Sequence, residues 1–188
     1  MASTILVDKI DPQSGTALEI GTSGDTVTVP SGATFNVAGT LQSGGAALAN
    51  TPYFLAERTG SNQTINNTTI TTIQYNTATI NEGSCYDTST YKFTPTTAGV
   101  YFFRAKMAWN STDDWDNSEM QLLKNSGSTI LDRYTFSNVY YNSCIVAATV
   151  SLTTSDSVYA FIYQSSGSSK DLLYGGWSSF TGWKLIAW

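Results

Sequence analysis

Residues 86–103 read YDTSTYKFTPTTAGVYFF, and this stretch decides the fold. Two short aromatic runs, at 91–93 and 100–103, flank a turn in which Gly99 allows a tight bend at low steric cost. Successive side chains of a strand point to opposite faces, so Tyr101 and Phe103 share one face. The stretch therefore predicts a β-hairpin whose aromatic side chains enter a core.

Short apolar runs bounded by polar turns continue on both sides of this hairpin. The run at 144–152 is almost continuously apolar, which is typical of a strand covered on both faces. No helical stripe extends over a window of about 11 residues. Expected strands cover 53–57, 64–75, 77–80, 91–93, 100–109, 119–123, 129–136, 144–152, 156–163 and 182–186. Roughly eight to ten such strands predict an all-β fold, a two-sheet antiparallel jelly-roll sandwich.

The composition excludes several kinds of catalytic and metal site. The 188 residues include no histidine, which excludes Ser-His-Asp and Cys-His nucleophiles, histidine metal ligands and histidine acid–base steps. The two cysteines, Cys85 and Cys144, cannot by themselves supply a tetrahedral zinc site. Charged residues are 12% of the chain, about half of the usual quarter, and aromatic residues are 13%. This balance is typical of a β protein with a polar, uncharged surface.

The net charge of −5 argues against a nucleic-acid partner, because no cluster of Lys and Arg is present to release phosphate counterions. No run approaches about 18 apolar residues, so we expect no membrane insertion. Residues 1–8 lack the basic and apolar regions of a signal peptide, and we therefore expect synthesis in a cytoplasm. In that compartment Cys85 and Cys144 are expected to be free thiols rather than a disulfide.

The first 50 residues differ from the rest, because their only aromatic residue is Phe35. The runs 26–29 and 34–37 alternate apolar and polar residues between turns, which predicts very short strands. One such chain buries too little apolar surface to offset its conformational entropy, whereas three chains wound together share an interior. A disordered Gly/Ser-rich leader is the alternative. The expected parts are an intertwined trimeric β shaft at 1–41, a small, flexible neck at 42–50 and the head domain at 51–188.

Four motifs of the head resemble the globular head of the complement-one-q family, a relative of the tumour-necrosis-factor jelly roll. The first hairpin matches the family pattern at Tyr86-Asp87, Phe93-Thr94-Pro95 and 99–103, with Pro95 one place earlier than in the pattern. The later matches are 121–127 with Ser126 inserted, 155–159 with Ser155 in place of glycine, and 179–185. The resemblance implies a two-sheet jelly roll of about ten strands that trimerises around a threefold axis.

The N-terminal part has a resemblance of its own. Residues 3–10 and 26–37 look like shaft repeats of bacteriophage tail-fibre proteins, particularly of marine phages. They stand where complement members carry a collagen-like stalk, which this sequence lacks. Together with a trimeric head, this resemblance implies a short trimeric appendage of a virion.

The densest acidic cluster is a candidate calcium site. Its members are Asp113, Asp114, Asp116 and Glu119. Closely spaced oxygen ligands suit Ca²⁺, although the order of residues lacks the Asp-x-Asp-x-Asp-Gly pattern of a calcium loop. A solvated acidic turn is the alternative, and no other cofactor is expected.

Four aromatic residues in polar surroundings are candidates for receptor binding. They are Tyr140, Tyr141, Trp115 and Trp177. Adjacent side chains of an extended segment point to opposite sides, so one ring of the pair Tyr140 and Tyr141 is expected to be exposed. Exposed aromatic rings stack on sugars or act as hot spots of protein interfaces. The alternatives are burial of the tyrosine pair in the core or a trimer contact, and packing of Trp177 within its loop.

Alternation within strands also gives candidates for the subunit contact and the core. Tyr159, Phe161 and Tyr163 share one face and are expected at the trimer interface, where each aromatic ring removes about 150–250 Å² from water. The expected core residues are Phe93, Tyr101, Phe103 and Trp183.

These observations favour a non-enzymatic, homotrimeric structural protein of a phage virion, made in the host cytoplasm. Residues 1–50 are expected to contact other virion proteins, and the head to recognise a receptor, with a host-surface glycan as the expected ligand. The alternatives are a capsid-decorating or head-fibre protein without a receptor role and, from another class, a tail spike that depolymerises a glycan. A glycoside hydrolase needs two carboxylates held in a cleft, and the spacing of Asp and Glu singles out no such pair.

Overall fold

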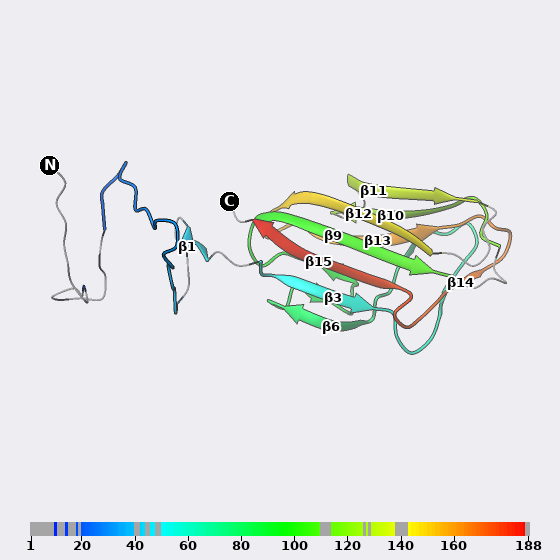
Figure 1. Ribbon diagram of the computed structural model, residues 1–188. Coiled ribbons are helices and arrows are strands. Elements are labelled where there is room, and N and C mark those ends of the chain that lie inside the picture. Colours follow the sequence, from blue (N-terminus) through cyan, green and yellow to red (C-terminus); the bar gives the residue numbers. More distant parts are fainter. Residues whose placement is uncertain are drawn as a thin grey trace. The chain divides into compact units, whose positions relative to one another are not determined.

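The computed structural model describes residues 10, 14, 18, 20–39, 42–43, 46–47, 50–109, 114–125, 127, 129–137 and 143–186 (Figure 1). Contacts divide the chain into two units, Met1–Thr40 and Leu41–Trp188. Within the described ranges all regular structure is β-strand, and no helix there could span a membrane. The prediction of an all-β antiparallel fold is confirmed.

The described residues of the first unit form turns but no strands. Backbone hydrogen bonds of 3.0 and 3.1 Å close turns at 22–25 and 30–33. Residues 26–29 and 34–37 form no strands in this single chain, and the shaft of three intertwined chains stays a prediction. A strand needs a neighbour for its backbone hydrogen bonds, and the described residues of this unit provide none. Val27 and Phe35 are 63% and 67% exposed.

Two antiparallel sheets form the head (Figure 1). The six-stranded sheet has the order β11 (Thr129–Phe136), β10 (Ser118–Lys124), β13 (Val158–Tyr163), β8 (Lys92–Phe93) and β7 (Tyr86–Asp87), with β5 (Thr71–Thr72) also paired to β13. The five-stranded sheet has the order β12 (Ser143–Leu152), β9 (Gly99–Ala108), β15 (Ser179–Ile186), β3 (Tyr53–Glu57) and β6 (Thr77–Glu82). Two short pairs complete the described strands: β4 (Gln63–Ile65) with β14 (Lys170–Leu172), and β1 (Gln42–Ser43) with β2 (Ala46–Ala47).

Aromatic rings fill the space between the two sheets. Phe54 is at their centre, with its ring centroid 4.8 Å from those of Tyr86 and Phe180. Phe93 and Phe103 meet edge to face at 4.9 Å, and the hydroxyl of Tyr101 donates to the Thr97 carbonyl at 2.6 Å. Phe93, Tyr101 and Phe103, which the sequence placed in the core, are fully buried. Such ring pairs add about 0.5–1.5 kcal/mol each to the burial of their area.

Trp183 corrects the fourth core prediction, because it lies on the outer face of β15. Its ring packs against Phe102 of β9 at 4.8 Å and stays partly exposed. The buried positions of this part of β15 are Phe180, Gly182 and Lys184, so alternation sends Trp183 outward. Position 182, which faces the core, is a glycine because the rings of Phe54 and Phe103 occupy the space that a side chain would need.

Two of the motifs that suggested the family bind each other. The Asp156 carboxylate accepts hydrogen bonds from the Thr153 backbone (2.7 Å) and the Asn125 amide (2.6 Å), and it pairs with Lys124 at 3.2 Å. In return, the Asn125 side chain accepts the Ser157 N–H at 2.8 Å. Burial would raise the pKa of Asp156, but these hydrogen bonds outweigh it and lower the pKa to about 2.

Several strand boundaries differ from those predicted. The run 64–75 is not one strand, since Thr68 has a positive φ of 54° and separates β4 from β5. Strand β12 is buried on one face only, with Ile145 43% exposed on the other. The sequence did not predict β7 or β14, each only two or three residues long.

Both cysteines are free and buried, at Cys85 and Cys144. Burial raises the pKa of the Cys85 thiol to about 11 and that of Cys144 to about 12. Both thiols are therefore protonated and unreactive near neutral pH.

Gly182 is expected to be intolerant of substitution. A Cβ at this position would lie 2.6 Å from Cε1 of Phe103 and 3.0 Å from Cε1 of Phe54. We therefore expect Gly182→Ala to lower the free energy of unfolding by about 1–3 kcal/mol, as measured by urea denaturation. Gly176→Ala is the control, because its Cβ would meet only an ordinary contact at 3.8 Å, and equal effects of the two substitutions would contradict the prediction.

Acid should weaken the head through Asp156. Its folded-state pKa of about 2 lies below the value of about 3.9 in unfolded chains, so the carboxylate stabilises the fold above pH 4 and loses this effect as the pH falls towards 2. Asp156→Asn should lower the free energy of unfolding by about 1–2 kcal/mol at pH 7 and by clearly less at pH 2. Urea unfolding at both pH values measures this, and an equal loss at the two would refute the role assigned to the carboxylate.

Candidate binding surface

The exposed candidate residue, Trp177, lies in a loop at one end of the head. Strands β3 and β9 run in the same direction, away from the end at which the chain enters the head at Tyr53, and β15 runs back between them (Figure 1). The cross-strand set of Glu57, Ser179 and Lys106 therefore lies towards the opposite end. We name this opposite end, with the described loop residues 58–62, 114–117, 137 and 173–178, the far end.

Trp177 is the predicted receptor residue that the structure leaves exposed. It lies in the loop before β15, 53% exposed, with Tyr174 of the same loop 50% exposed. The Lys106 ammonium lies 5.8 Å from the centroid of the Trp177 ring, within the range of a cation–π contact. Two aromatic rings and a cation thus lie within one surface loop and the strand beside it.

Hydrogen bonds hold this loop to the one after β3. The Gly175 N–H donates to the Arg58 carbonyl at 2.7 Å, and the Arg58 N–H donates to the Ser178 carbonyl at 3.1 Å. The Tyr174 N–H donates to the Asn62 side chain at 3.2 Å. Because the backbone is held on both sides, a ligand need not order this loop on binding.

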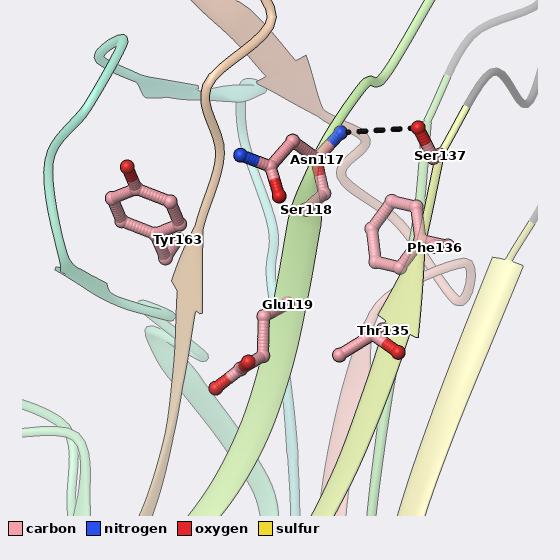
Figure 2. A pocket seen from close by; sticks show the side chains of 7 residues that line it. All are labelled: Asn117, Ser118, Glu119, Thr135, Phe136, Ser137 and Tyr163. Carbon is pink, nitrogen blue, oxygen red and sulfur yellow. Dashed lines mark hydrogen bonds between the residues drawn. The ribbon is translucent and has the colours of Figure 1, made fainter.

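A pocket of about 390 Å³ lies between β10, β11 and the end of β13 (Figure 2). Its lining residues are Asn117, Ser118, Glu119, Thr135, Phe136, Ser137 and Tyr163, and we name it the Tyr163 pocket. Thr135, Glu119 and Tyr163 are direct cross-strand partners, so a hydroxyl, a carboxylate and an aromatic ring form one row across three strands. In the view of Figure 2 the Asn117 amide and the Glu119 carboxylate both point towards the side on which Tyr163 lies.

Neighbouring side chains fix the Glu119 carboxylate. The Gln121 amide donates a hydrogen bond to it, and the Arg133 guanidinium lies 3.8 Å away. Because Arg133 is more than half exposed, this ion pair is weak. The carboxylate thus keeps its orientation and stays able to accept further hydrogen bonds.

Trp115 is not a receptor residue, which corrects that prediction. It is fully buried and packs against the rings of Trp109, at 5.5 Å, and Phe136, at 6.1 Å. Because its neighbours in sequence are polar and acidic, the sequence does not reveal that Trp115 belongs to an aromatic cluster with Trp109 and Phe136. This cluster closes the core beneath the far end. Tyr140 and Tyr141 lie outside the described residues.

The carboxylates predicted to bind calcium do not form a cluster in the part of the chain that the structure describes. No group of three or more potential metal ligands is found there. Asp116 accepts hydrogen bonds from the Asn117 N–H (2.9 Å) and the Ser137 hydroxyl, and Glu119 is held by Gln121. Asp114 has a hydrogen-bonding or electrostatic partner of its own, and Asp113 lies outside the described residues. The arrangement is that of an acidic turn satisfied by its neighbours.

The residues predicted for the trimer contact lie on the outer face of the six-stranded sheet. Tyr159, Phe161 and Tyr163 are each partly buried there. The Lys92 ammonium lies 5.0 Å from the Tyr159 ring centroid, and the partners of Phe161 and Tyr163 on β10 are Gln121 and Glu119. Polar and charged groups therefore surround these rings.

The outer face of the five-stranded sheet is more apolar at the end where the chain enters. A pocket of about 320 Å³ is lined by Asn50, Tyr53, Phe54, Leu55, Ile80, Thr181, Gly182 and Trp183. The tilted rings of Phe102 and Trp183 pack together beside it, and Tyr53 and Ile80 are exposed. We name this surface, formed by Tyr53, Leu55, Ile80, Phe102 and Trp183, the apolar face.

Sequence reasoning missed Asn117, Thr135 and Ser137 of the pocket and the exposure of Tyr174. Tyr174 carried a signal, because it precedes the pair Gly175-Gly176 in a turn. The pocket residues carried none, since they come from separate segments that only the strand register brings together.

The head matches known jelly rolls in both sequence and structure. The family model of the C1q domain matches residues 53–185. No curated protein matches the chain. The solved globular domain of zebrafish complement 1qA protein is 16% identical with a TM-score of 0.55, and the match covers 72% of this chain and 98% of that one.

Two further solved structures share the fold. Murine APRIL, in its structure at pH 8.5, is 15% identical with a TM-score of 0.54, covering 71% of this chain and 98% of that one. Eiger TNF from S. frugiperda is 12% identical with a TM-score of 0.54, and the match covers 72% of this chain and 93% of that one. At 12–16% identity the structural matches show the fold alone. The family is shown by the C1q domain model, which spans most of the chain. The chain belongs to the C1q domain family, whose jelly-roll domains commonly form homotrimers and typically act in binding rather than catalysis.

Proposed function

We propose that this chain is a non-enzymatic, homotrimeric structural protein of a phage virion whose head binds a glycan on the host surface. The observation that carries the proposal is the pair of exposed rings, Trp177 and Tyr174, on a braced loop of the far end. This is the end of the head that points away from Tyr53, where the N-terminal segment joins. A fibre attached through that segment would present the far end to its target.

The chemistry of the loop suits a sugar. An indole ring offers an apolar face to the C–H groups of a pyranose, and Trp and Tyr each combine such a face with a group that can hydrogen-bond. Lys106, on the neighbouring strand, can donate hydrogen bonds to sugar hydroxyls, and the carboxylate of Glu57 can accept hydrogen bonds from them. A Cβ on Gly176 would lie 3.8 Å from Glu57 Oε1, which places this carboxylate beside the loop.

In the proposal the subunits meet through the apolar face. An exposed apolar surface is typical of a protein interface. Charged residues are depleted at the centre of interfaces, so the outer face of the six-stranded sheet, where charged groups surround the rings, is less suited to the subunit contact. This assignment moves the contact from Tyr159, Phe161 and Tyr163, predicted from the sequence, to Phe102 and Trp183. It leaves the outer face of the six-stranded sheet open to solvent.

The N-terminal segment would complete the fibre. Its exposed apolar side chains, Val27 and Phe35 among them, have no partner strand within the described part of one chain. Three chains wound together would bury them and supply the missing backbone hydrogen bonds. Residues 1–50 would then attach the trimer to other virion proteins.

The subunit contact can be tested by solution mass. At micromolar concentration the chain should elute with three times its 20.3-kDa mass. Phe102→Glu or Trp183→Glu should raise the dissociation constant at least tenfold, because each buries a charge in an apolar contact. Phe161→Glu is the matched control and should stay trimeric. A monomeric wild type would refute the trimer, and dissociation by Phe161→Glu alone would return the contact to the six-stranded sheet.

Receptor binding can be tested with host cells. Trp177→Ala should weaken the binding of the labelled trimer at least tenfold, since it removes an aromatic contact of hot-spot type. Tyr134→Ala, which removes another exposed aromatic residue of 47% exposure, should bind normally.

Two outcomes separate the alternatives. Full binding by Trp177→Ala, together with antibody labelling of the capsid surface, would indicate a decorating protein without a receptor role. Release of reducing ends from host polysaccharide would indicate a depolymerising spike.

A further inference from the structure

We infer that the Tyr163 pocket is a second sugar site and that it binds one neutral pyranose unit. The inference rests on the proposed function, because it adds a second contact to the same glycan-binding head. It concerns a different sheet from the Trp177 loop, since Tyr163 ends β13 of the six-stranded sheet whereas Trp177 precedes β15 of the five-stranded one.

The pocket has the size and shape of a small-ligand site. Its volume of about 390 Å³ lies at the lower end of the roughly 300–1000 Å³ that is typical of such sites. Tyr163 borders it on one side and Thr135 on the other, with Glu119 between them (Figure 2). Adjacent strands lie about 4.8 Å apart, so the row spans two spacings, about 9.6 Å, which leaves room for one sugar ring with its hydroxyl groups.

The row combines the three kinds of group that a pyranose needs. The half-buried Tyr163 ring can stack on an apolar sugar face. The Glu119 carboxylate, held by Gln121, can accept two hydroxyl hydrogen bonds, which are stronger than those between neutral groups. Among the described residues no hydrogen bond engages the Asn117 side-chain amide or the Thr135 hydroxyl, so both are available to a ligand.

Local charge selects a neutral sugar over an acidic one. Glu119 lines the pocket, and Asp116 hydrogen-bonds to Asn117 and Ser137 of its wall. The cation nearest to Glu119 among the described residues is Arg133, 3.8 Å away and more than half exposed to solvent. A sugar carboxylate or sulfate would approach Glu119 without a compensating buried cation, which is unfavourable.

Backbone geometry keeps the binding groups in place without a ligand. The Asn117 N–H donates to Asp116 at 2.9 Å and to the Ser137 hydroxyl at 3.4 Å, which joins the segments before β10 and after β11. Asn117 has a positive φ of 39°, a conformation that asparagine tolerates better than most residues. The wall of the pocket is therefore preorganised, and binding need not order it.

The test uses the full-length protein and saturation-transfer NMR with four probes: methyl glucoside, methyl galactoside, N-acetylglucosamine and glucuronate. At least one neutral probe should bind, with glucuronate at least tenfold weaker. Tyr163→Ala and Glu119→Gln should each weaken the neutral probe at least tenfold. Tyr159→Ala, on the same face of the same strand, is the matched control and should bind normally. Glu119→Gln keeps the shape of the side chain, so it reports on the carboxylate even if Tyr163→Ala alters the fold.

The outcomes separate this inference from the proposed function. No binding of any neutral probe, binding unchanged in both variants, or glucuronate binding as tightly as the neutral sugars would each overturn the inference. If Trp177→Ala still loses host binding in those cases, the proposed function stands without the pocket. Neutral-sugar binding that depends on Tyr163 and Glu119 supports the inference, even if Trp177→Ala binds host cells normally and the Trp177 contact is wrong.

Discussion

The packing of the head depends on the space left by one missing side chain. At Gly182 the rings of Phe54 and Phe103 lie directly against the backbone of β15. Strand β15 is the middle strand of the five-stranded sheet and pairs with β3 and β9, which carry those two rings. A side chain there would push the rings apart and disturb their contacts with Tyr86, Phe93 and Phe180. Because Gly182 faces the core, alternation along β15 places the next residue, Trp183, on the outer face.

A second constraint links the turn end of the head to the Tyr163 pocket at its other end. Lys124 and Asn125 are bound to Asp156 and Ser157, and this contact sets the first pair of the β10–β13 ladder, Lys124 with Val158. The register then continues without interruption to Glu119 and Tyr163. A hydrogen-bonded turn at one end therefore determines which two side chains meet in the pocket at the other. This gives a physical reason for the motifs at 121–127 and 155–159 that suggested the family.

Much of the fold could be predicted because the local signals agree with the final structure. Strands β3 and β11 have the predicted bounds, and Phe93, Tyr101 and Phe103 are buried as alternation implies. The pocket could not be predicted, because a β-bulge between Leu122 and Leu123 shifts the register and sets Glu119 opposite Thr135. The sequence wrongly indicates a surface position for Trp115, because its neighbours in sequence are acidic. Its neighbours in space are the rings of Trp109 and Phe136. Alternation alone also predicted strands at 26–29 and 34–37, but the described part of the chain places no neighbouring strand beside them.

The two buried thiols have a consequence for how the head responds to its surroundings. Histidine and cysteine are the side chains that ordinarily change protonation between about pH 6 and 9. This chain has no histidine, and the pKa values of Cys85 and Cys144, at about 11 and 12, lie above that range. The pKa of Asp156, at about 2, lies well below this range, so its carboxylate is already ionised. These three side chains therefore keep their charge near neutrality, and ordinary drifts in acidity do not act on the head through them.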